Sequence, residues 1–190
     1  MARVVGLTGG IGSGKSEALA AFARHGAVTL SSDDIVHRLY DLPEVRQAVA
    51  EQVGADILAA DGSIDRPELG RRAFADPELL RFLEALLLPL VAERFAAWRD
   101  DQVAGGAALL VHEAPTLFEA GVEDRYDAIV TITAPEDVRE QRRPGAAARM
   151  ARQLPEAEKA ARSDYVYRNT GTLEQLDEFV AGVIRDLGAA

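Results

Sequence analysis

The sequence predicts an α/β fold in which a five-stranded parallel sheet is flanked by helices. Short apolar runs of strand type alternate with helical stretches, and this alternation is typical of a parallel sheet covered by helices. The chain has 190 residues, of which 48% are hydrophobic. This length is sufficient for one apolar core with a sizeable insertion.

The expected elements of the core follow from its apolar runs. We expect five strands, at residues 3–8, 27–31, 109–112, 128–133 and 164–167. Good helix formers occupy residues 17–24, directly after the first strand. Residues 173–187 carry apolar side chains at helical spacing and predict a closing amphipathic helix.

A long segment interrupts this alternation, because it contains no convincing strand. We expect its helices at 34–41, 43–53, 67–74 and about 78–101. Pro89 lies inside the last of these and should kink or divide it. Gly105-Gly106 has the composition of a return hinge. The predicted organisation is therefore a core of residues 1–33 and 106–190 with a helical insertion, residues 34–105.

The first strand leads into the most informative motif of the chain. Residues 9–16 read Gly-Gly-Ile-Gly-Ser-Gly-Lys-Ser, which matches G-x-x-x-x-G-K-[ST]. A glycine-rich turn between a strand and a helix directs backbone N–H groups and the positive helix end at one point, where a polyphosphate can bind. Glycine at several positions allows the backbone to approach the phosphate oxygens closely. The fold is therefore expected to be of the P-loop NTPase type.

Two side chains of this loop have predicted roles in nucleotide binding. Lys15 supplies a positive charge near the β- and γ-phosphates, and the Ser16 hydroxyl is placed to bind Mg²⁺. A glycine-rich turn without a ligand is the alternative, but the four glycines and the Lys-Ser pair favour a nucleotide site. The expected nucleotide-binding residues of this segment are Gly10, Ile11, Gly12, Ser13, Gly14, Lys15, Ser16 and Glu17.

Composition excludes several classes of partner. The net charge of −10 argues against nucleic acid, which usually requires a basic face. No apolar stretch approaches the ~20 residues of a membrane helix, and no secretory signal is expected at the beginning. The chain has no cysteine, which excludes disulfides and thiolate metal sites. We expect a cytoplasmic protein, either a monomer or a small homo-oligomer.

The positive charge is concentrated in one segment. Glu140 is the only acid between residues 139 and 152, and the five arginines there are Arg139, Arg142, Arg143, Arg149 and Arg152. In an acidic chain such a cluster indicates an anionic partner, although a solvated helix face paired with acids is the alternative. Beside a phosphate loop, we expect a short Arg-rich lid at about 139–153 that neutralises the transferred phosphoryl group.

A phosphate loop alone does not separate kinases, GTPases and ATPase motors. A GTPase should carry Asn-Lys-x-Asp, whereas the single asparagine, Asn169, is followed by Thr170 and Gly171. A motor usually needs a longer chain and a hydrophobic strand that ends in Asp-Glu. The small size, the helical insertion and the arginine cluster therefore favour a small-molecule kinase.

An ordered set of segments resembles the dephospho-coenzyme A kinase family over residues 4 to about 180. The matching segments are Val5–Ser16, Leu30–His37, Gly62–Arg66, Pro115–Glu119, Arg149–Gln153 and Ser163–Gly171. The phosphate loop alone is generic, but the set in this order is highly specific. The resemblance implies a kinase that uses ATP and Mg²⁺ to phosphorylate the 3′-hydroxyl of dephospho-coenzyme A.

The resemblance also implies roles for residues outside the loop. Asp33 corresponds to the family's carboxylate at the ribose 3′-hydroxyl and is the candidate catalytic base. Lys15 is a second candidate catalytic residue. Arg142 is the candidate catalytic lid arginine, although the segment is shorter than usual and Arg143 stays open as an alternative. The remaining implied residues are Arg149 at the phosphates, Asn169 near adenine, and Arg66 and Glu113 at the acceptor.

Each of these side chains also has a purely structural interpretation. Asp33 opens an apparent helix and could be its N-cap. Asn169 could be a turn asparagine before Gly171. Glu113 could be a solvated residue at the edge of the third strand, rather than an active-site carboxylate at the end of that strand.

The chain departs from the family pattern at a few positions. Ser31 replaces an aspartate, Glu17 a threonine, Leu88 a histidine and Thr116 a leucine. The changes on the acceptor side leave open a kinase for another small acceptor, such as a nucleoside monophosphate or a sugar acid. A non-catalytic nucleotide-binding regulator is the third alternative.

Overall fold

The computed structural model describes residues 2–146 and 153–188. Contacts divide the chain into two compact units, which are Met1–Ser31 with Arg99–Ala190, and Ser32–Trp98. The expected insertion, 34–105, covers most of the second unit and the last residues of one long helix. The two units are described separately.

The first unit contains the sheet. Its strands are β1 (Arg3–Gly9), β2 (Val28–Ser31), β3 (Leu109–Glu113), β4 (Ala128–Thr133) and β5 (Tyr165–Arg168). All neighbouring strands run parallel, in the order β2-β3-β1-β4-β5. Three strands are almost fully buried, which explains their nearly continuous apolar runs. The predicted five-stranded parallel sheet is confirmed.

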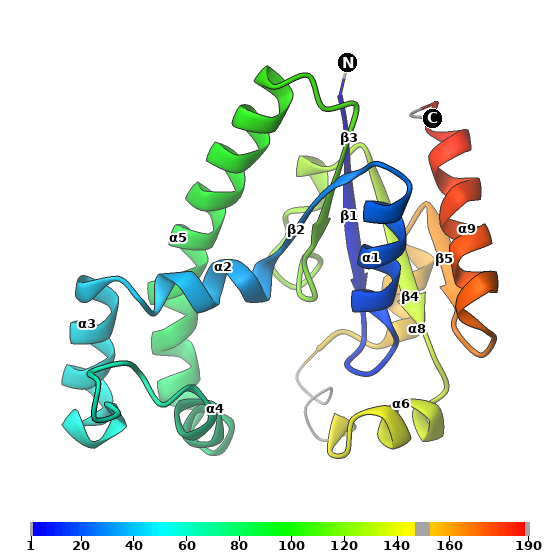
Figure 1. The fold of residues 1–190 in the computed structure, drawn as a ribbon. Coiled ribbons are helices and arrows are strands. Elements are labelled where there is room, and N and C mark those ends of the chain that lie inside the picture. Colours follow the sequence, from blue (N-terminus) through cyan, green and yellow to red (C-terminus); the bar gives the residue numbers. More distant parts are fainter. Residues whose placement is uncertain (1, 147–152, 189–190) are drawn as a thin grey trace. The chain divides into compact units, whose positions relative to one another are not determined.

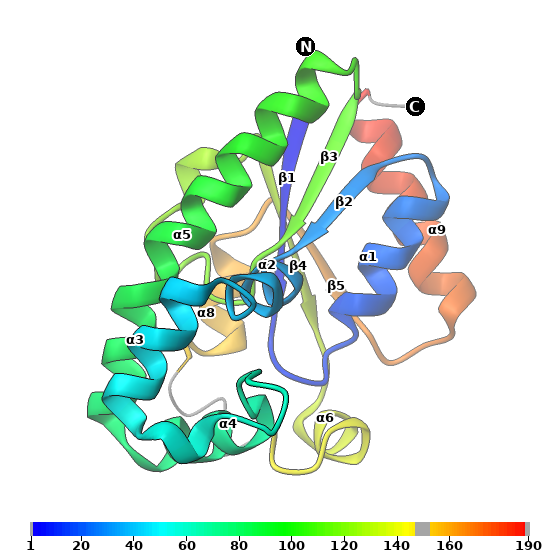
Figure 2. The ribbon, with the colours of Figure 1, turned by 60° about the vertical axis from the view of Figure 1, so that its left-hand side comes forward.

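Two helices cover one face of this sheet. Helix α1 (Lys15–Arg24) and helix α9 (Leu173–Asp186) lie side by side along it (Figures 1 and 2). Phe22 and Val180 are fully buried, in one cluster with β1 residues Val5 and Leu7. Thr172 caps α9 in a capping box with Gln175. The strongest expected amphipathic helix is therefore present and packs as its pattern predicts.

The opposite face holds a smaller apolar cluster and an unusual polar pair. The Tyr126 ring packs on this face, and a Cβ added to Gly6 would lie 3.0 Å from it. His112 is buried, and its Nδ1 lies 2.9 Å from the Tyr126 hydroxyl. Burial, assisted by the charge of Arg125, lowers the pKa of His112 to about 4. The imidazole is therefore neutral at pH 7.

Short helices follow β4 and lead to β5. These helices are α6 (Glu136–Arg142) and α8 (Glu156–Ala161). A further short helix, η2 (Glu123–Arg125), lies before β4. The expected lid, about 139–153, includes residues 147–152, which lie outside the described part of the chain. Within the described ranges, no helix is long and apolar enough to cross a membrane.

The second unit is helical. Its elements are α2 (Ser32–Leu39), α3 (Pro43–Val53), η1 (Ala55–Ile57), α4 (Arg66–Ala75) and most of α5 (Pro77–Ala104). The expectation that Pro89 could divide the last helix is wrong, because α5 is continuous. Proline removes only one helical hydrogen bond there, and buried Leu83, Leu87 and Phe95 support the helix on both sides.

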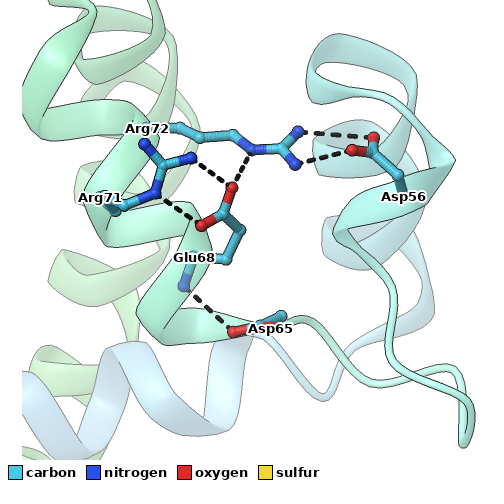
Figure 3. Close-up of polar contacts among 5 residues, drawn as sticks. All are labelled: Asp56, Asp65, Glu68, Arg71 and Arg72. Atoms are coloured by element: carbon cyan, nitrogen blue, oxygen red, sulfur yellow. Dashed lines mark hydrogen bonds and ion pairs between the residues drawn. The ribbon is translucent and has the colours of Figure 1, made fainter.

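A network of charged side chains joins α4 to η1 on the surface of this unit (Figure 3). Arg72 bonds Glu68 at 2.7 Å and Asp56 at 2.6 Å, and Arg71 makes two bonds to Glu68. Asp65 caps α4 by accepting the Glu68 N–H. The bonds from Arg71 and Arg72 lower the pKa of Glu68 to about 2. Through these bonds, the network holds the beginning of α4, at Asp65 and Arg66, in place.

Candidate functional site

The phosphate loop lies between the end of β1 and the start of α1, as its motif predicts. Gly14 is the N-cap of α1 and adopts a left-handed conformation with φ of 101°. Lys15, the first helical residue, is only 9% exposed and its Nζ donates to the Gly10 carbonyl at 3.0 Å. The ammonium is therefore held over the loop, where it can bind phosphate oxygens with charge-assisted hydrogen bonds.

Asn169, at the end of β5, holds the loop from one side. Its Nδ2 donates to the Ser13 carbonyl at 2.8 Å, and its backbone N–H donates to the Thr133 carbonyl. A Cβ at Gly14 would lie 2.2 Å from that Nδ2, so this close approach requires glycine. Asn169 is thus buried against the loop. This contact with the loop does not test the expectation that Asn169 lies near adenine.

Arg142, at the end of α6, reaches the same loop. Its guanidinium lies 3.4 Å and 3.3 Å from the carbonyl oxygens of Gly12 and Ser13, and 3.5 Å from that of Asn169. Arg143 makes no hydrogen bond to the loop within the described residues. Arg149 lies outside them, so its expected phosphate contact stays a prediction. The structure places Arg142 beside the phosphate loop.

A second group of polar residues lies at the carboxyl ends of β2 and β3. Ser31 and Glu113 are register partners, and the Ser31 hydroxyl donates to Glu113 Oε2 at 3.0 Å. Glu113 is 6% exposed, so its interpretation as a solvated edge residue is wrong. The substitution of serine for the family's aspartate therefore leaves a hydroxyl bound to this carboxylate. In parallel α/β sheets, ligands bind at this end of the strands.

The remaining predicted residues lie in the helical unit. Asp33 is the second residue of α2 and stands in its first turn. The expectation that it could be the N-cap is therefore wrong, because the helix begins one residue earlier. Arg66 is the first residue of α4, next to the cap Asp65. Burial raises the pKa of Tyr40, and the charge of Arg66 opposes this change. Arg66 thus lies near Tyr40.

Sequence reasoning missed a third group, centred on α8. Glu156 accepts a hydrogen bond from the Gly10 N–H at 3.2 Å and lies 3.8 Å from Arg139 Nε. Lys159, one turn later, is fully buried and donates to the Pro115 carbonyl and to Glu119. The rarity of lysine singles out Lys159, because only two lysines are present. Glu156 has no comparable signal in the sequence.

The described residues contain no group of three or more His, Asp or Glu side chains that could hold a metal ion. Mg²⁺ usually takes one or two protein oxygens and completes its shell with water and substrate phosphates. Ser16, in the first turn of α1, is the loop hydroxyl available for this purpose.

Comparison with known proteins assigns the chain to a family. The family model described as dephospho-CoA kinase matches residues 3–175. The chain belongs to the dephospho-CoA kinase family. A dephospho-CoA kinase of Brucella melitensis is 37% identical, with 97% of this chain and 94% of the relative covered. A dephospho-CoA kinase of Syntrophotalea carbinolica is 39% identical, with 96% and 91% covered.

Solved structures agree with this assignment. The crystal structure of TT1252 from Thermus thermophilus has a TM-score of 0.77 and 32% identity, with 98% of both chains covered. The dephospho-CoA kinase from Campylobacter jejuni has a TM-score of 0.74, again with 98% of both chains covered. At 23% identity this second likeness shows the fold alone. The fold of the family is therefore the fold described here.

Proposed function

We propose that the protein transfers the γ-phosphoryl group of ATP to the 3′-hydroxyl of dephospho-coenzyme A, which yields coenzyme A and ADP. Family membership over residues 3–175 is the observation that carries this proposal. The phosphate loop, with Lys15 and Arg142 beside it, supplies the groups that phosphoryl transfer requires. The reaction is the last step of coenzyme A synthesis, and a cytoplasmic location is consistent with it.

The nucleotide side of the reaction is assigned to the first unit. The backbone of the loop from Gly10 to Glu17 surrounds the phosphates, with the N–H groups after Gly10 as donors, because the Gly10 N–H is bonded to Glu156. Lys15 places its positive charge near the β- and γ-phosphates. Arg142 leaves the loop carbonyls to contact the transferred group, where negative charge is spread over three oxygens in the transition state. Arg149 adds a second phosphate contact, and Asn169 lies near adenine.

Three further residues are assigned to the acceptor. Asp33 positions the 3′-hydroxyl and accepts its proton late in the reaction, as a general base does. Arg66 binds a negatively charged part of the acceptor, since an arginine fork suits phosphate groups. Glu113, held by Ser31, orients the acceptor at the carboxyl ends of the strands. The helical insertion therefore supplies Asp33 and Arg66 for the acceptor, and the sheet supplies Glu113.

Mg²⁺, which neutralises charge on the β- and γ-phosphates when bound, fits Ser16 as its protein ligand. Glu113, a buried carboxylate at the carboxyl end of β3, would suit a contact with the ion through water. Lys15 and Arg142 would share the compensation of phosphate charge with the ion. Activity should therefore be lost in EDTA and restored by added Mg²⁺.

The direct test is an assay of purified protein with ATP and Mg²⁺, in which ADP release is followed with a panel of acceptors. We expect turnover with dephospho-coenzyme A and a mass increase of one phosphate on that acceptor. Preferred turnover of a nucleoside monophosphate or a sugar acid would contradict the acceptor assignment. ATP binding without turnover of any acceptor would indicate the regulator instead.

A further inference from the structure

Glu156 lies where the helix after the lid meets the phosphate loop. Its side chain is 15% exposed, and one carboxylate oxygen accepts the Gly10 N–H at 3.2 Å. The other oxygen lies 3.4 Å from the backbone nitrogen of Ala134, which follows β4. A carboxylate from α8 therefore contacts the backbone at the start of the loop and at the carboxyl end of β4, the strand next to β1.

The same carboxylate compensates a buried arginine. Arg139 Nε lies 3.8 Å from Glu156 and donates to the Ala134 carbonyl at 3.0 Å. Only 11% of the Arg139 side chain is exposed. Arg139 belongs to α6, one turn before Arg142, whose guanidinium contacts the loop carbonyls. Glu156 thus connects α8, α6 and the phosphate loop through one ion pair and one backbone hydrogen bond.

Helix α8 is itself firmly anchored. Lys159, one turn after Glu156, has no exposed surface and places its Nζ 2.7 Å from the Pro115 carbonyl and 2.8 Å from Glu119. The Pro115 carbonyl also accepts the hydroxyl of Thr8, which comes directly before the loop. An anchored helix can hold Glu156 in one place, and a buried charged hydrogen bond strongly restricts its partner.

We propose that Glu156 is a positioning residue for ATP. Its carboxylate fixes the Gly9–Gly10 peptide, where β1 turns into the loop, and keeps Arg139 in place so that α6 presents Arg142 to the phosphates. The Gly10 carbonyl accepts Lys15, so the segment that Glu156 holds also carries the partner of that lysine. Glu156 acts through these groups and does not itself touch the phosphates. This inference rests on the proposed function only in naming ATP as the ligand.

The test compares three variants by calorimetric titration with ATP, without acceptor, so that the identity of the acceptor has no influence. Glu156→Ala removes the contacts with Gly10, Ala134 and Arg139 and should raise the Kd for ATP about tenfold, which corresponds to about 1.4 kcal/mol. Glu156→Gln keeps an oxygen for the Gly10 N–H and should raise it less. Glu158→Ala is the matched control, because the Glu158 side chain is half exposed and, within the described part of the chain, forms its ion pair with Arg162 at 3.9 Å, away from the loop.

The steady-state constants and the thermal midpoint separate positioning from general support of the fold. We expect the KM for ATP to rise in Glu156→Ala while the KM for dephospho-coenzyme A changes less than about twofold. A lower Tm with an unchanged Kd for ATP would overturn the proposal. Should the alanine variant not fold, the glutamine variant decides, since a Kd equal to that of wild type would also overturn it. Absence of dephospho-coenzyme A turnover in the wild type would contradict only the proposed function.

Discussion

The two units of this chain use polar side chains in opposite ways. In the unit with the sheet, buried charged or amide groups such as Lys15, Glu156 and Asn169 bond to the backbone of the phosphate loop. In the helical unit, the network of Glu68, Arg71 and Arg72 joins side chains to one another at the surface. Buried bonds to backbone fix the geometry of a site, whereas exposed ion pairs contribute little to stability.

The largest effect should come from the loop lysine. Lys15→Ala removes the positive charge that lies near the β- and γ-phosphates. We expect this change to abolish turnover while the fold stays intact. The thermal midpoint and the far-UV circular dichroism spectrum check the fold. Near-normal activity of a folded Lys15→Ala protein would refute the assignment of the loop.

The second effect tests whether the helical unit carries any catalytic group. Asp33→Asn should lower kcat by at least about 10²-fold, the scale of general-base catalysis, with a much smaller change in ATP affinity. Asp34→Asn, also in the first turn of α2, is the control and should leave kcat close to wild type. Both changes remove one negative charge from the same helix end, so equal kcat values would mean that Asp33 has no chemical role.

The third effect separates two adjacent arginines. Arg142, the last residue of α6, contacts the loop carbonyls, whereas Arg143 follows the helix in an extended conformation. Arg142→Ala should therefore lower kcat by up to about 10²-fold, and Arg143→Ala should have a small effect. Arg149→Ala should behave as the loss of a further phosphate contact. Small and equal losses at all three positions would mean that the cluster is a solvated face.

The fourth effect is a loss of stability as the pH falls. We expect it from the buried His112 and not from the exposed His37. The pKa of His112 is about 4 in the folded chain and 6.5 as its ordinary value, so the folded state binds the proton less tightly. His112 therefore lowers stability as the pH falls from about 6.5 towards 4. His112→Gln, which can still bond Tyr126, should reduce this loss in urea titrations at pH 7 and 4.5. His37→Gln, on the exposed side of α2, should leave the loss unchanged.

The smallest effect should come from the surface network. The pKa of Glu68 is lowered to about 2, so its contribution is fully present above about 4.5 and is lost as the pH falls through about 2. Glu68→Gln should shift the thermal midpoint at pH 7 by only about 2 °C or less, and less again in 1 M salt. A larger, salt-insensitive shift would show that the network supports the helical unit as the buried groups support the loop.

Local sequence patterns were sufficient to predict the sheet and the phosphate loop. They were insufficient to predict the long-range contacts that hold the loop in place. Apolar runs and the glycine motif predicted the five strands and the position of Lys15, because burial and backbone geometry leave periodic signals in sequence. The Glu156–Gly10 contact joins positions 146 residues apart, and a lone glutamate carries no sign of such a partner. Of the two outcomes expected at Pro89, division of the helix is wrong, since tertiary packing of α5 outweighs a local helix breaker.

The contact between Gly6 and Tyr126 has a consequence for how this chain can vary. A methyl group at position 6 would lie 3.0 Å from the ring, which is held in place by packing and by its hydroxyl bond to His112. Alanine at position 6 therefore requires the ring to move by a few tenths of an ångström, and a smaller side chain at position 126 would relieve the contact but deprive the histidine of its partner. These three positions should accordingly change together among related chains, as one inherited unit.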